Sequence, residues 1–240
     1  MIRYLAVFIS PLIILATCWW FFYYQSGLWW LVGLSLFFIL LSGRLISRHY
    51  FFRFKNLWFN LITAYLSQIL FLLLLTSSAL RYSLSFLLVI LWLGLFWVLN
   101  QQFDSRRAVD AKDYLYYNKF FYYLSFWFLA TSIYSLVVFV DLPLAYAILF
   151  ILISSYFWSR EIMKTDDSLK FYHILLSIFL LLQIALVIYF WAVSFYIAGT
   201  ILTLWLFFIL ESILNHFKNF SWYAGLFFLS FVIVLLSSIF

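Results

Sequence analysis

Few polar residues interrupt the long apolar runs of this chain, and Glu211 is the most conspicuous of them. It is the one acidic residue that falls inside such a run. Glu211, Asn215 and Lys218 follow one another at i, i+4 and i+7, which places them on one face of a helix. A carboxylate in hydrocarbon could bind a proton or a cation. The alternative is a carboxylate that reaches the membrane interface or bonds to Asn215 and a neighbouring helix.

Two glutamines, Gln68 and Gln183, lie near the middle of other apolar runs. An amide that faced lipid would leave its N–H donors without partners, so we expect both side chains to face other helices. Hydrogen bonding between helices is one interpretation. A place in a transport pathway, together with Glu211, is the other.

The longest polar segment, between Asn100 and Lys119, could carry a different chemistry. Asn100 and Asp104 are four residues apart at a helix end, and Glu161 could face them across the same side of the membrane. Carboxylates of this kind could hold Mg²⁺ on a diphosphate, with Arg106 and Arg107 on the phosphates. The alternative is a solvated, positively charged loop that only sets the topology.

The pattern Asn100-x-x-x-Asp104 resembles the opening of the first motif of the intramembrane prenyltransferases. Those enzymes have a similar number of spans and Asn/Asp-rich motifs on two cytoplasmic loops. The resemblance implies a lipid-processing enzyme. The chain departs from the pattern at Ala108, where the next Asp would stand, and at Arg160-Glu161-Ile162, which lacks the spaced aspartates of the second motif.

The composition indicates whether lipid or water surrounds these residues. Of 240 residues, 68% are hydrophobic and only 9% are charged, against roughly 45–50% and 25% in soluble domains. A chain this apolar cannot cover its own core with polar surface, so a soluble protein is excluded and the lipid bilayer is the expected partner. The apolar runs are continuous and do not alternate with polar residues, which favours helices over a barrel. The fold class is therefore all-α, a polytopic integral membrane protein in one transmembrane domain, 1–240.

The apolar runs predict nine transmembrane helices, each broken from the next by a turn or a charged loop. Their expected ranges are 4–24, 28–46, 57–77, 84–102, 121–140, 142–159, 172–191, 195–214 and 223–240.

Charge is distributed very unevenly over this map. Of the 14 basic residues, all but Arg81 fall at ends of spans on one side, and Asp141 is the acidic exception. Because Lys and Arg are retained in the cytoplasm during insertion, this side is predicted to be cytoplasmic, with the N-terminus inside. We expect a bacterial cytoplasmic membrane. The net charge of +6 follows this topology, so no nucleic acid is predicted as a partner.

The single cysteine, Cys18, excludes an internal disulfide and a Cys-rich metal site. The segment Leu15-Ala16-Thr17-Cys18 resembles a lipoprotein cleavage site, which leaves lipidation of Cys18 open. Apolar residues continue through Trp19 to Tyr24, so an uncleaved first span is favoured. Three histidines near the expected interfaces make a poor metal or haem site, so no metal and no cofactor are predicted.

Four segments suggest an internal repeat of helical hairpins. Each has a Leu-Phe pair about three helical turns before a basic end: Leu36-Phe37, Leu95-Phe96, Leu149-Phe150 and Leu206-Phe207. A fourfold hairpin duplication would produce this pattern. Any hairpin in a Leu- and Phe-rich chain could also produce it.

These observations leave three hypotheses about function. The first is a non-enzymatic membrane subunit or scaffold that docks a membrane or cytoplasmic protein partner through its basic cytoplasmic loops. The second is a small-solute or lipid transporter. The third is an intramembrane lipid-processing enzyme, prenyltransferase-like, built on the loop residues.

Overall fold

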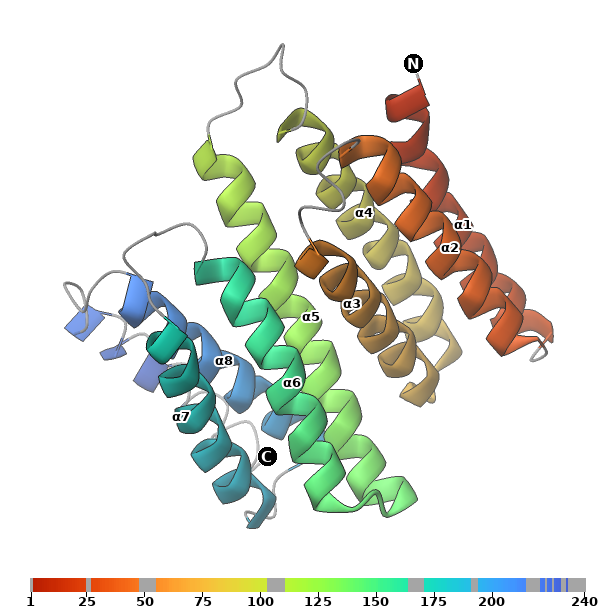
Figure 1. Ribbon diagram of the computed structural model, residues 1–240. Helices are drawn as coiled ribbons and strands as arrows, with labels where there is room; N and C mark the ends of the chain where they lie inside the picture. The colour runs from red at the N-terminus through yellow and green to blue at the C-terminus, as the bar shows by residue number, and fades with distance from the viewer. Residues whose placement is uncertain are drawn as a thin grey trace. The chain divides into compact units, whose positions relative to one another are not determined.

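The computed structural model describes residues 2–24, 27–47, 55–102, 111–163, 171–190 and 194–214, with separate residues between 221 and 232. Within this part of the chain the secondary structure is helical, without strands (Figure 1). The helices are α1 (Ile2–Tyr24), α2 (Leu28–Ser47), α3 (Lys55–Leu74), α4 (Ser78–Gln102), α5 (Ala111–Val140), α6 (Leu144–Met163), α7 (Phe171–Phe190) and α8 (Phe195–Leu214).

Six helices of the described part are long and apolar enough to cross a membrane: Arg3–Tyr24, Leu28–Ser47, Ser78–Gln101, Lys119–Val140, Phe171–Phe190 and Phe195–Leu214. Two shorter apolar helices are Trp58–Leu74 and Leu144–Arg160. The outer surfaces of the helices carry large apolar side chains, such as Trp29 and Trp30 of α2, which are 85% and 87% exposed. Lipid is the solvent in which such a surface is favourable, so the structure indicates a multi-pass membrane protein.

Part of the polar segment between Asn100 and Lys119 is helical, where the sequence predicted a loop. α4 ends at Gln102, as expected, but α5 begins at Ala111, ten residues before the expected span. The added stretch 111–120 contains no Gly or Pro, and helical hydrogen bonds do not require an apolar sequence. Apolarity therefore marks where a span crosses lipid but not where its helix ends.

The chain divides into two compact units, residues 1–121 and 122–240, with the boundary inside α5. In the first unit α1 packs against α2 and α4, and α3 contacts both of those helices. Side-chain hydrogen bonds join three helix pairs: Thr17 to Ser35 (2.7 Å), Trp19 Nε1 to Ser85 Oγ (3.1 Å), and Trp92 Nε1 to Gln68 Oε1 (2.7 Å). Bonds of this kind average about 0.6 kcal/mol in membrane proteins, so packing supplies most of the stability.

In the second unit α7 packs against α6 and α8. The 122–140 part of α5 is tied to α7 and α8: Tyr134 donates to the carbonyl of Ala185 (2.8 Å), and Trp127 Nε1 donates to Thr200 Oγ1 (3.0 Å). Further along, Gly199 of α8 meets Thr131 of α5 at a distance that leaves no room for a Cβ atom. Small residues allow this close approach of two helices in lipid.

The two charged exceptions in the sequence lie near helix ends: Arg81 in the first turn of α4, and Asp141 in the turn between α5 and α6. Arg81 donates from Nε to the carbonyl of Leu75 (2.6 Å), just past the end of α3, and lies 5.9 Å from the centre of the Phe22 ring. Asp141 has φ 53°, the left-handed conformation that often follows the last residue of a helix, and the N–H of Leu142 donates to the carbonyl of Leu136 (3.3 Å). Both residues therefore have local roles in ending helices.

The four Leu-Phe pairs of the proposed repeat differ in environment. Leu95 and Phe96 are buried, whereas Phe37, Leu149 and Phe150 are more than half exposed. Leu206 is buried and Phe207 is half-buried. Burial therefore does not follow the repeat, and the duplication stays a prediction.

Candidate functional site

Glu211 lies in the last described turn of α8, half-buried, where the hydroxyl of Tyr123 donates to its Oε1 at 3.3 Å. The ring of Tyr123 meets the ring of Phe207 edge-on, with centroids 5.3 Å apart. Phe207 precedes Glu211 by four residues, so one face of α8 holds both the ring and the hydroxyl of Tyr123. Packing on Phe207 thus aims the phenol at the carboxylate.

A phenol beside a carboxylate can keep its hydrogen bond in both protonation states of the acid. Tyr123 donates to ionised Glu211, and its oxygen can accept a hydrogen bond from the protonated acid. Glu211 and Tyr123 each have further interactions. Asn215, expected on the same face, lies outside the described residues.

Gln68 and Gln183 have different environments, although the sequence predicted the same one for both. Gln68 is buried and accepts the hydrogen bond from Trp92, which links α3 to α4. Gln183 is exposed on α7 in the described part of the chain, and the expectation that it faces another helix stays a prediction. Its helix neighbours Phe179 and Val187 are each 56% exposed. Among the six candidate spans, α7 has the smallest buried share, 22%, so most of its surface faces outward.

The loop candidates are only partly described. Asn100 is buried near the end of α4. Glu161 lies in α6, and its side chain is outside the description, as are Asp104, Arg106 and Arg107 entirely. The Mg²⁺ and diphosphate hypothesis therefore stays a prediction. Within the described residues, no three His, Cys, Asp or Glu side chains gather as a metal site would require.

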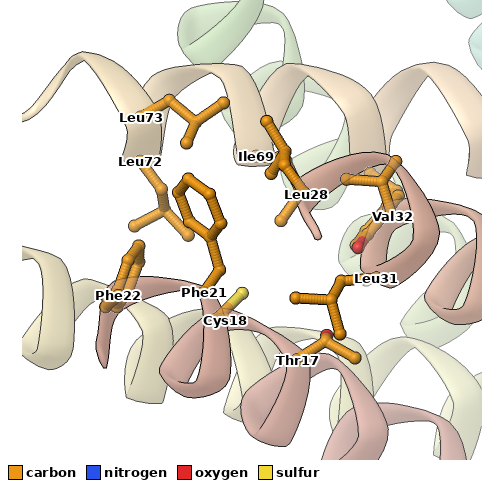
Figure 2. Close-up of a pocket in the computed structure, with 11 residues that line it drawn as sticks. Thr17, Cys18, Phe21, Phe22, Leu28, Leu31, Val32, Ile69, Leu72 and Leu73 are labelled. Atoms are coloured by element: carbon orange, nitrogen blue, oxygen red, sulfur yellow. The ribbon is translucent and has the colours of Figure 1, made fainter. Parts of the chain in front are cut away.

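Sequence reasoning did not single out a cluster of hydroxyls between α1, α2 and α3. The hydroxyl oxygens of Thr17 and Ser35 lie 2.7 Å apart, and the hydroxyl of Tyr65 is close to both. Thr17 and Tyr65 also line an apolar pocket, together with Cys18, and Figure 2 labels Thr17 and Cys18. Ser, Thr and Tyr occur in most of the spans, so no spacing in the sequence distinguishes these three.

Asn60 of α3 is the most isolated buried polar side chain of the first unit. It is fully buried, and among the described residues neither its amide nitrogen nor its amide oxygen has a hydrogen-bond partner. Leaving an amide unpaired costs about 1–3 kcal/mol. A single amide identifies no chemistry by itself.

The chain matches no known family model, no curated protein and no solved structure. Function is therefore proposed from the geometry and chemistry of its own residues.

Proposed function

We propose that this chain is a non-enzymatic subunit or scaffold of a bacterial cytoplasmic membrane, and that its basic cytoplasmic loops dock a protein partner. The observation that carries the proposal is the concentration of basic residues on one side of the span map. Arg160 stands exposed in the last turn of α6, at an end assigned to that side. Arg81, on the other side, is engaged in ending α3. An acidic protein surface is the partner that such a face would attract.

The proposal includes nine spans, with the N-terminus in the cytoplasm. To test this orientation, single cysteines are introduced into the loops of the Cys18→Ala variant, and intact cells are labelled with a membrane-impermeant maleimide. Cysteines at 76 and 142 should react from outside, whereas those at 105 and 166 should react only after the cells are permeabilised. The reverse pattern would contradict the orientation.

Affinity purification in mild detergent, followed by mass spectrometry, tests for the partner. A stoichiometric protein partner is the expected result. The double variant Arg106→Gln and Arg107→Gln should reduce its recovery, because it removes two positive charges from the longest polar loop. The charge-keeping variant Arg106→Lys and Arg107→Lys is the matched control. Purification without any protein partner would count against a scaffold.

A second function, transport of a small solute or lipid, is favoured by the Tyr123–Glu211 pair. If Glu211 carries a coupling proton or cation, Glu211→Gln should abolish uptake by the chain in proteoliposomes while the protein still folds. Tyr123→Phe removes only the phenol hydroxyl and should leave partial uptake. Equal uptake by wild type and Glu211→Gln would exclude this mechanism.

A further inference from the structure

We propose that the pocket between α1, α2 and α3 binds one acyl chain of a phospholipid, with the lipid phosphate at Arg81. The empty space of about 290 Å³ includes the open space in front of the pocket, so the pocket receives part of a chain and does not enclose it. Its floor consists of four buried residues, and its rim of seven half-buried ones. The floor residues are Thr17, Cys18, Tyr65 and Leu72.

The lining of the pocket is almost entirely apolar. Figure 2 shows the Cys18 sulfur and the Phe21 ring turned toward the empty space. The hydroxyl of Thr17 is already bonded to the carbonyls of Ile13 and Ile14 and to Ser35. A polar ligand would give up its hydrogen bonds to water in the pocket without gaining new ones. A hydrocarbon chain has no such bonds to give up.

The pocket lies at one end of all three helices. Phe21 and Phe22 are in the last turn of α1, Leu28 begins α2, and Leu72 and Leu73 precede the end of α3 at Leu74. Span ends lie next to the lipid headgroups. An acyl chain that enters the pocket here therefore belongs to a lipid whose headgroup stays at the membrane interface.

Arg81 supplies the charge that identifies this head. Its guanidinium lies over Phe22, which lines the pocket, and its Nη2 is 3.5 Å from the carbonyl of Leu73, another lining residue. Its Nε bonds to Leu75. Arginine has five N–H donors in a planar fork that matches a phosphate. The remaining donors make an anionic phosphate the fitting partner at the rim.

Crosslinking in the native chain tests the proposal. The full-length protein is reconstituted with a phosphatidylglycerol that carries a diazirine in one acyl chain, irradiated, and mapped by mass spectrometry. We expect adducts on the floor residues Thr17, Cys18 and Tyr65. Adducts spread only over exposed α1 positions such as Leu12 would overturn the proposal, and this outcome needs no variant.

Two further comparisons test the acyl-chain site and the phosphate contact separately. Val32→Trp fills the rim and should remove the floor adducts, whereas Leu34→Trp, on an exposed position of the same helix, should keep them. A diacylglycerol with the same diazirine chain lacks the phosphate and should give fewer floor adducts than phosphatidylglycerol. Equal labelling by both lipids, or floor adducts that persist in Val32→Trp, would refute the phospholipid site.

Discussion

The contact between Gly199 of α8 and Thr131 of α5 predicts that a single added methyl group destabilises the second unit. A Cβ built on Gly199 would lie 2.8 Å from the backbone nitrogen of Thr131 and 2.9 Å from its Cα, in addition to a closer contact with Oγ1. The hydroxyl could rotate away, but the backbone atoms could not. Gly199→Ala therefore requires α5 and α8 to move apart.

The size of the effect follows from two opposing contributions. Overpacking of a tight contact costs typically about 1–3 kcal/mol. Replacing Gly by Ala inside a helix favours folding by about 0.5–1 kcal/mol. We expect a net loss of roughly 1–2 kcal/mol for Gly199→Ala, since the neighbour is backbone. A Cβ added to Gly33, in α2, would meet no atom within 4 Å, so Gly33→Ala should show the helix gain alone.

Unfolding in mixed micelles of mild detergent and sodium dodecyl sulfate, followed by far-ultraviolet circular dichroism, would measure both variants. Gly199→Ala should unfold at a lower fraction of dodecyl sulfate than wild type, and Gly33→Ala at an equal or higher fraction. If Gly199→Ala were as stable as Gly33→Ala, α5 and α8 would not be in the close contact described here, and the reasoning would be wrong.

Three other changes test local features of the fold. Asp141→Gly should stabilise the chain by up to about 1 kcal/mol in the same unfolding assay, because glycine adopts positive φ without the cost an L side chain bears; a loss would contradict the assigned end of α5. Gln68→Leu should lower the free energy of unfolding by about 1–2 kcal/mol, because it leaves the buried indole N–H of Trp92 unpaired. On heating with a fluorogenic maleimide, the buried Cys18 of this variant should react at a lower temperature than in wild type. Trp92→Phe combined with Gln68→Leu should cost less than the two single losses added together, and full additivity would exclude the bond.

The sequence by itself determined the solvent of this protein and the positions of most of its helices. Expected spans and observed helices agree closely at 28–46 against Leu28–Ser47 and at 195–214 against Phe195–Leu214. Continuous apolar runs bounded by charge carry this information, because lipid admits a helix only where every side chain tolerates hydrocarbon. The extra turns at the start of α5, residues 111–120, contain charged and polar side chains, so the apolar pattern does not report them.

Only the tertiary structure decided which faces of the helices are buried. Gln68 is buried and Gln183 is exposed, although both lie mid-span, and Tyr123 reaches a carboxylate 88 residues away. In water, a polar stripe marks the outer face of a helix. Lipid tails are as apolar as a protein core, so the same Leu, Ile and Phe residues serve on both faces. The pocket at Cys18 and the Tyr123–Glu211 pair depend on those faces, and the apolar pattern of the chain does not specify them.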